Sequence, residues 1–246
     1  MSNKEEYRLF ISKPKLLEEL IYCHKRFCKL MPYFFELENS SPIKVCLNEK
    51  DKQMGVFKFE YKPFMIFINP NKLSSFQEAL FTTAHESGHY LHFLKRPEFY
   101  ESTMDTNLKD KSAIESLKII NILFPIRELI ADSSSFEFFR REDLLDRFLT
   151  KQKQLALEKL KLFGDGLVYC MREPFDVLVH YYVYKKLVDE KRTLEIMTGG
   201  YSNFFFNQIG LMIDEGKKYI AKSFNITNLD ALPHENEPTF FDQISI

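Results

Sequence analysis

The segment His85-Glu86-Ser87-Gly88-His89 carries the residues whose types and spacing could perform chemistry. Its two histidines are four positions apart, so on a helix they lie one turn apart on one face, and both imidazoles can reach the same cation. Glu86 projects beside them and could act as a base on a metal-bound water. This HExxH pattern predicts a metal site with His85 and His89 as ligands and Glu86 as the catalytic residue.

A catalytic zinc site commonly has three protein ligands and an open position for water, so a third ligand is needed. In the extended form of the motif a third histidine would stand at position 95, where this chain has Lys95. A ligand at His92, one turn further along the same helix, would draw the ion out of tetrahedral reach, and we interpret His92 as a helix histidine. We therefore expect a carboxylate ligand from a second helix.

Three pairs of acidic residues have a spacing that would let the first acid bind the metal and the second accept the free N–H of a ligand histidine. The pairs are Glu101 with Asp105, Glu128 with Asp132, and Glu142 with Asp146. The first pair lies in a polar segment and the last among arginines, whereas apolar residues separate and flank Glu128 and Asp132. Buried carboxylates need partners, and a metal and a histidine would provide them. A salt bridge from Glu128 to Arg127 or Lys118 is the alternative.

Hydrolysis through a tetrahedral oxyanion would also need a hydrogen-bond donor besides the metal. Four side chains are candidates: His180, Tyr181 and Tyr184 on an apolar helix late in the chain, and Tyr90 near the motif. We name His180 as the candidate catalytic donor. A position in the core or at the rim of the site is the alternative for each of the four.

Helices and short strands are expected where they would position these residues. Ser75 and Glu78 form a capping box that opens the HExxH helix, which continues to about Leu94, and Gly88 in its interior costs about 1 kcal/mol unless another group approaches the backbone there. Apolar periodicity predicts further helices over 15–30, 113–123, 126–139, 142–162, 174–188 and 202–224. Residues 43–69 predict three short antiparallel strands, of which 64–69 would be an edge strand able to hold an extended peptide. The aperiodic residues 95–112 predict a surface loop that could act as a lid or bind a partner.

Length and composition favour one compact domain of the α+β class, mainly helical with a small sheet of about three strands before the HExxH helix. Within the 246 residues we expect a metal-site core over about 40–140, a helical part over 141–224 and an irregular tail over 225–246. The net charge of −1 disfavours direct nucleic-acid binding, and the apolar runs are too short to cross a membrane. With no secretory signal pattern and no CxxC pairing among four cysteines, a cytoplasmic protein with free thiols is expected.

The stretch from Ala84 to His92, followed by Glu128-Leu129-Ile130-Ala131-Asp132, resembles the ImmA/IrrE-type metallopeptidases, which are gluzincin-like enzymes. In that family, short strands precede the HExxH helix and end in a pattern like that of Phe67-Ile68-Asn69 here. The likeness covers about residues 40–140. The resemblance implies a zincin-like fold and one Zn²⁺ ion held by His85, His89 and Glu128, with Glu86 as acid/base and Asp132 behind a ligand. The family commonly has a large aliphatic residue where Ser87 stands.

These features predict a zinc metalloendopeptidase in which Glu86 takes a proton from a metal-activated water and passes it to the leaving amine. The resemblance implies a protein or peptide substrate, with a transcriptional repressor as a candidate, because family members act in bacterial or phage regulation. The alternative is a metal-containing regulatory protein that works by binding a partner, with little or no proteolysis. A purely structural metal would leave Glu86 without a role.

Overall fold

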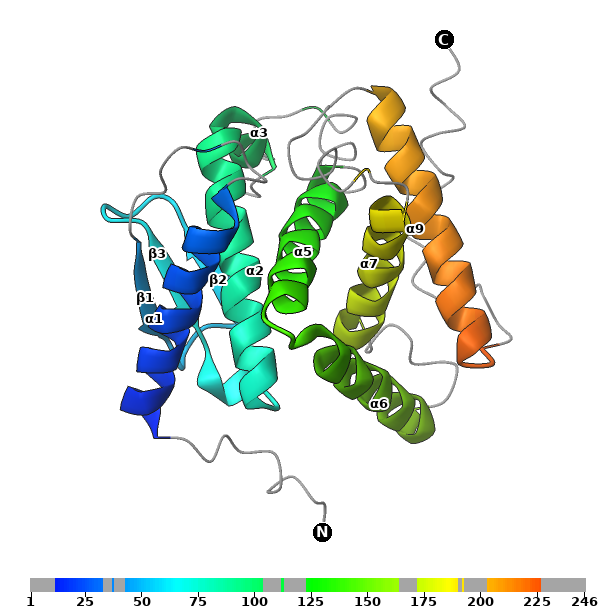
Figure 1. Cartoon of the computed structure of the whole chain (residues 1–246), viewed down its shortest axis with the longest axis horizontal. Coiled ribbons are helices and arrows are strands. Elements are labelled where there is room, and N and C mark those ends of the chain that lie inside the picture. Colours follow the sequence, from blue (N-terminus) through cyan, green and yellow to red (C-terminus); the bar gives the residue numbers. More distant parts are fainter. Residues whose placement is uncertain are drawn as a thin grey trace.

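Two helices that lie side by side, α2 (Phe76–Lys95) and α5 (Phe124–Arg141), form the centre of the molecule (Figure 1). The computed structural model describes residues 12–32, 37, 43–103, 112, 123–163, 172–189, 192 and 203–226. The other elements are α1 (Lys13–Leu30), β1 (Lys44–Leu47), β2 (Gly55–Lys58), β3 (Met65–Ile68), the short 3-10 helix η2 (Pro70–Lys72), α3 (Pro97–Ser102), α6 (Leu145–Phe163), α7 (Arg172–Asp189) and α9 (Asn203–Ser223). The protein is therefore mainly helical with a small sheet, as the α+β prediction required.

The start of α2 is set by the predicted capping box. The Ser75 hydroxyl accepts the Glu78 backbone N–H at 3.2 Å, and the Glu78 carboxylate accepts the N–H of Ser74. These bonds satisfy amides that have no partner within the helix. Helix α2 ends at Lys95, one residue beyond the predicted end. The Ser75–Glu78 pattern thus places the motif histidines well inside a helix.

The three strands form a mixed sheet in the order β1-β3-β2, which corrects the antiparallel prediction. β1 runs parallel to β3, whereas β2 runs antiparallel to it. Residues 64–69 therefore supply the central strand, and their predicted place at an edge was wrong; β1 and β2 are the edges. Alternating apolar residues identify strands but do not specify their neighbours, and here the chain forms both edges before it returns through the middle.

Part of the predicted loop at 95–112 is also helical. Pro97 occupies the first turn of α3, where its missing N–H costs nothing, and the Tyr100 side chain is buried. Its ring lies 5.8 Å from the rings of both Phe57 and Phe93. The loop prediction was wrong for α3 because this short helix is stabilised by contacts with the neighbouring α2 and with β2, which is distant along the chain. Residues 104–111 lie outside the described part of the chain.

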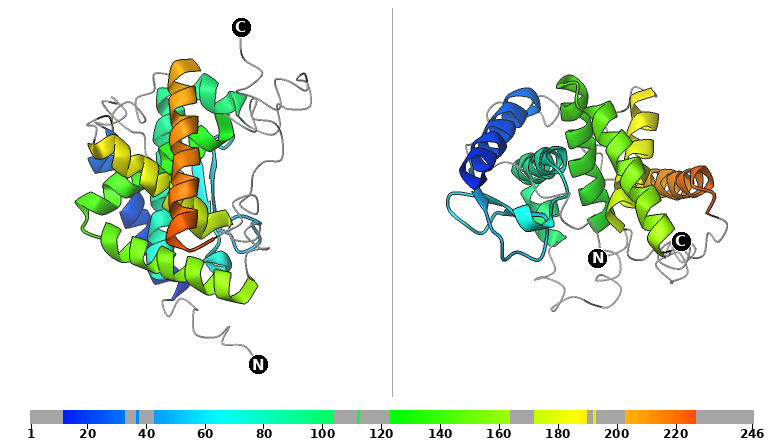
Figure 2. Two further views of the ribbon diagram at one scale, coloured as in Figure 1. Left: turned by 90° about the vertical axis from the view of Figure 1, so that its right-hand side faces the viewer. Right: turned by 90° about the horizontal axis from the view of Figure 1, so that it is seen from below.

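The later helices cover the side of α5 that faces away from the sheet. Pro125 stands in the first turn of α5, so this helix begins at Phe124 and not after the proline. Asp143 has a φ of 58° between α5 and α6, which ends the earlier helix and moves the start of the next from the predicted 142 to Leu145. α7 packs against α5, α6 and α9, and α9 lies furthest from the sheet (Figure 2). The helix predicted over 113–123 falls almost entirely outside the described residues.

Two expectations from composition can be compared with the described residues. Among them, no helix combines the length and the apolar character that crossing a bilayer requires. Cys23, Cys28 and Cys46 are free thiols, as predicted, and Cys170 lies outside the described part.

Candidate metal centre

The backbone of α5 approaches that of α2 closely at Gly88. A Cβ atom added there would lie 3.1 Å from the Cα of Ala131 and 3.2 Å from its carbonyl oxygen. Few side chains have room at such distances, so the glycine lets the backbones of α2 and α5 come nearly into contact. The close approach inferred from Gly88 is confirmed, and it sets the motif histidines opposite the first turns of α5.

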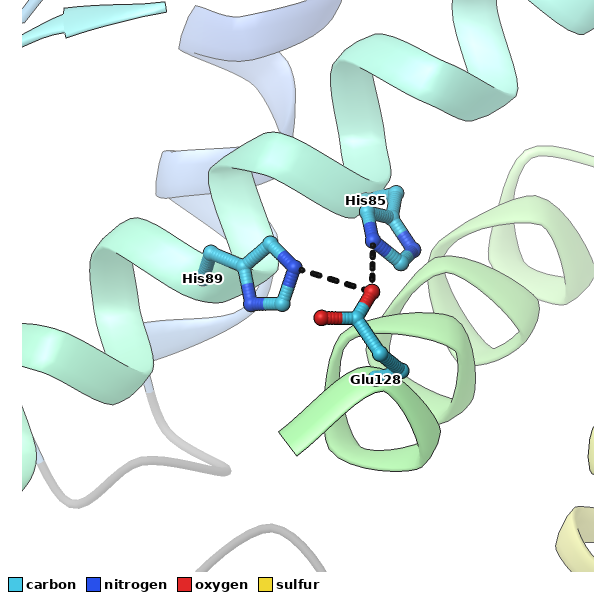
Figure 3. Close-up of side chains that lie close together, drawn as sticks. All are labelled: His85, His89 and Glu128. Carbon is cyan, nitrogen blue, oxygen red and sulfur yellow. Dashed lines mark hydrogen bonds and ion pairs between the residues drawn. The ribbon is translucent and has the colours of Figure 1, made fainter. Parts of the chain in front are cut away.

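His85, His89 and Glu128 converge across this helix pair (Figure 3). Each offers one ligand atom, and these atoms lie within 4.8 Å of one another. The Glu128 Oε2 atom is 3.2 Å from His85 Nε2 and 3.5 Å from His89 Nε2. The pair with apolar neighbours, Glu128 and Asp132, reaches the histidines, whereas Asp105 of the first pair lies outside the described residues. The group could hold a metal ion.

Asp132 orients the His85 ring and determines which of its nitrogens carries a proton. Its Oδ1 atom lies 2.7 Å from His85 Nδ1, and because an ionised carboxylate only accepts hydrogen bonds, the proton belongs on Nδ1. Nε2 faces an oxygen of Glu128 at 3.2 Å, a contact that needs a positive charge between the two atoms: a proton on Nε2 in the metal-free protein, or a metal ion in its place. The donor set fits a divalent metal, which would satisfy both atoms.

The pKa values describe a charged His85, a neutral His89 and an ionised Glu128. Burial acts to lower the pKa of His85, but Asp132, with help from Glu128 and Glu86, raises it well above its usual value, so a metal would have to displace the Nε2 proton. Burial lowers the pKa of His89 to about 4, so its ring is neutral and able to bind a metal at pH 7. Burial acts to raise the pKa of Glu128, but the two histidines outweigh it and hold this pKa well below its usual range. Burial likewise opposes ionisation of Asp132, whose pKa is nevertheless lowered to about 2 by the charge of His85 and by hydrogen bonds from His180 and His85.

Glu86 points from α2 toward β2 and is almost fully buried. Burial raises its pKa to about 7, helped by the charge of Glu128 and opposed by His85, the backbone N–H of Phe57 and Arg127. A carboxylate with a pKa near 7 is well matched to moving a proton at neutral pH. Sequence reasoning missed the contribution of β2, although a glycine within an apolar strand, here Gly55, often marks a close approach.

Gly55 leaves the space that the Glu86 side chain occupies. A Cβ atom at Gly55 would lie 2.6 Å from Thr82 Cγ2 and 2.9 Å from Glu86 Oε1. We expect Gly55→Ala to destabilise the fold by about 1–3 kcal/mol, because β2 or Glu86 must move. Urea unfolding measures this loss. Thr82→Ser should recover part of it in the double variant by removing the closest atom; equal stabilities of Gly55→Ala and wild type would contradict the packing described here.

Of the oxyanion candidates, His180 contacts Asp132, the partner of His85. Its Nδ1 atom lies 2.5 Å from Asp132 Oδ2. The Tyr184 hydroxyl instead donates to Glu137 at 2.7 Å, and the Tyr181 ring packs against Phe136. Tyr90 is fully buried among aromatic rings, including Phe57 and Phe64.

His92 and Arg127 lie near the group of His85, His89 and Glu128 but are not candidate ligands. His92 is fully buried against Phe99 and Tyr100, and burial lowers its pKa to about 3, consistent with the interpretation of a helix histidine. Arg127 Nη2 lies 3.0 Å from Glu128 Oε1, so the salt bridge considered as an alternative to metal binding exists beside the histidine contacts. The salt bridge and the histidine contacts are compatible, because they use different oxygens of the carboxylate. Lys118 lies outside the described residues.

Ser87 has a partner that sequence reasoning did not identify. The Ser87 hydroxyl donates to the carbonyl of Thr83 at 2.6 Å, and His24 Nδ1 of α1 lies 2.9 Å from the same hydroxyl oxygen. His24 therefore donates from Nδ1. This buried polar contact joins α1 to the face of α2 opposite His85 and His89.

His24 should make the stability of the protein depend on pH. Burial, with a smaller contribution from Lys25, lowers its pKa to about 4, whereas the unfolded value is about 6.5. The contribution of His24 to the free energy of unfolding should be fully present above pH ~6.5 and fall by about 3 kcal/mol as pH drops to 4, because only the unfolded chain binds the proton on this residue in that range. His89 and His92, whose pKa values are lowered to about 4 and about 3, add to the fall in wild type and variant alike. Urea titrations of metal-free protein at pH 7, 5.5 and 4.5 should show a shallower fall for His24→Gln than for wild type. Parallel curves would refute this role.

Comparison of the chain with protein-family models, with curated proteins and with solved structures gives no match. The assignment of a metal site therefore depends on the geometry of His85, His89, Glu128 and Asp132.

Proposed function

We propose that the protein is a zinc-dependent metallopeptidase that hydrolyses a peptide bond in a protein substrate. The observation that supports this most directly is the convergence of His85 Nε2, His89 Nε2 and Glu128 Oε2, with Asp132 fixing the proton of His85 on the opposite nitrogen. The likeness of the HExxH and ExxAD segments to ImmA/IrrE-type enzymes supports the same choice of metal and reaction.

Zinc held by these three ligands would polarise the peptide carbonyl and lower the pKa of a bound water. Glu86 accepts the proton of the attacking water and delivers it to the leaving nitrogen, for which its pKa of about 7 is suited. Asp132 accepts hydrogen bonds from His85 and His180, and so orients a ligand and a candidate donor together. His180, whose pKa is raised by Asp132 against the effect of burial, donates from its other ring nitrogen to the developing oxyanion.

Strand β2 is the proposed docking edge for an extended substrate. It pairs with β3 on one side, and within the described residues no strand pairs with its other side. The backbone N–H of Phe57, on the same strand, bonds to the carboxylate of Glu86. A peptide added along β2 would therefore lie close to the proposed base. A repressor or related regulatory protein is the candidate substrate, on the likeness to the family alone.

The Glu86→Gln variant tests the proposal. Wild type and variant should each bind one zinc ion, measured by elemental analysis after dialysis. Each is then incubated with a peptide library prepared from a whole proteome, and new N-termini are identified by mass spectrometry. Cleavage should fall by at least about 100-fold in Glu86→Gln, because the base is lost while the ligands remain.

Glu98→Gln, an exposed change on α3, is the matched control and should cleave like wild type. Absence of cleavage by zinc-loaded wild type, both with the library and on co-expression with neighbouring gene products, would overturn the peptidase proposal. Full biological activity of Glu86→Gln would instead favour a regulatory protein that acts by binding.

A further inference from the structure

Arg127 and the two histidines contact different oxygens of the Glu128 carboxylate, the proposed third ligand. Its Nε and Nη2 atoms donate to Glu128 Oε1 at 3.2 and 3.0 Å, whereas the histidines face Oε2. Neighbouring residues on a helix point about 100° apart, so a contact between residues 127 and 128 is not the default on α5. Other groups must hold the guanidinium in this position.

Those groups come from α3 and from the start of α5. Arg127 Nη1 donates to the Thr103 hydroxyl at 2.9 Å, and the guanidinium carbon lies 4.5 Å from the centre of the Phe124 ring and 5.2 Å from that of Tyr100. Arg127 is only 8% exposed, so these contacts are made with little competition from water. The Tyr100 ring also lies 5.6 Å from the ring of His89. The same short helix therefore contacts one ligand directly and a second ligand through Arg127.

We infer that Arg127 is the positioning residue that makes Glu128 a one-oxygen ligand. A carboxylate can bind a metal through one oxygen or through both, and two-oxygen binding would use the position that a hydrolytic water needs. By occupying Oε1, Arg127 leaves only Oε2 for the metal. Thr103 and Tyr100 hold Arg127 in place, so the coordination of the metal depends on the packing of α3.

Attraction to the metal cannot be the reason for Arg127, because a guanidinium and a divalent cation repel each other. Three carboxylates, those of Glu86, Glu128 and Asp132, lie at the site and would offset part of the positive charge of the metal and of Arg127. The planar guanidinium places two N–H donors on one oxygen in a fixed geometry, which the ammonium group of lysine cannot reproduce. Arg127→Lys should therefore fail to restore the coordination even though it keeps the charge.

Cobalt(II) provides the test, because its visible absorption reports coordination number and does not require activity. This inference rests on the proposed metal site, so wild type is measured first and should bind one cobalt ion with the intense bands of low coordination. Arg127→Met and Arg127→Lys should show weaker, shifted bands, and their zinc affinity should fall about 10- to 100-fold. Thr103→Val should change the spectrum in the same direction but less.

Arg140→Met is the matched control, because Arg140 also donates from Nε and Nη2 to a carboxylate of α5, that of Glu137, with one donor to each oxygen. Its spectrum and zinc affinity should equal those of wild type. Wild-type spectra for Arg127→Met and Thr103→Val would overturn the inference while leaving the peptidase proposal intact, whereas failure of wild type to bind metal would overturn both. Circular dichroism of the metal-free proteins checks folding, and if Arg127→Met is unfolded, the Lys and Thr103 variants decide the outcome.

Discussion

Glu128→Gln is expected to lower zinc affinity by more than about 100-fold, beyond the loss usual for an outer partner of a metal site. The amide keeps the size of the side chain and can still accept hydrogen bonds from Arg127, so the fold should persist. It lacks the negative charge that faces His85 and His89, and two imidazoles alone hold zinc weakly. Competition with a fluorescent zinc chelator measures the dissociation constant directly.

Two further variants, each in an acidic pair with the spacing of Glu128 and Asp132, provide comparisons for the zinc affinity of Glu128→Gln. Asp132→Asn should cost about 10- to 100-fold, because Asp132 acts through His85 and not on the metal. Glu142→Gln changes the acid of another ExxxD pair, which accepts a hydrogen bond from Arg26 at 3.0 Å, and should leave affinity unchanged. Tight stoichiometric zinc binding by Glu128→Gln would show that the third ligand lies elsewhere.

Gly88→Val is expected to destabilise the protein by about 3 kcal/mol and to weaken metal binding in the molecules that remain folded. The new side chain meets the backbone of Ala131, which cannot rotate away, so α2 and α5 must separate. The proposed ligands come from these two helices, and a shift of a fraction of an ångström would disturb their convergence. Gly88→Ala should lose less stability, since its better helix propensity returns up to about 1 kcal/mol. Thermal unfolding and zinc titration give the two quantities.

Gly216 of α9 serves as the control for Gly88. A Cβ atom there would lie 3.0 Å from Tyr182 Cδ1 and 3.3 Å from Val179 Cγ1, which are atoms of side chains that can move. Gly216→Val should therefore destabilise less than Gly88→Val and should leave the zinc affinity of the folded protein unchanged. If both valine variants bind zinc equally tightly, the geometry of the site does not depend on the helix contact at Gly88, and the prediction is contradicted.

Local pattern was sufficient for several parts of this protein. The spacing of His85 and His89 puts both on one helix face, and Ser75 with Glu78 marks where that helix begins. Gly88 indicated a close neighbour, and apolar residues around Glu128 distinguished it from the other acidic pairs. Each inference used residues within a turn or two of one another, where helix geometry alone decides which side chains share a face.

Tertiary structure decided the rest. The order of the strands, the packing of Gly55 against Glu86 and the contact of His24 with Ser87 each join elements that are distant along the chain. The separate contacts of the two Glu128 oxygens, one with Arg127 and one with the histidines, likewise depend on α3, whose stability comes from aromatic contacts with other elements. A sequence pattern specifies an element and its buried face, whereas the partner of that face is selected only when competing long-range contacts are formed together.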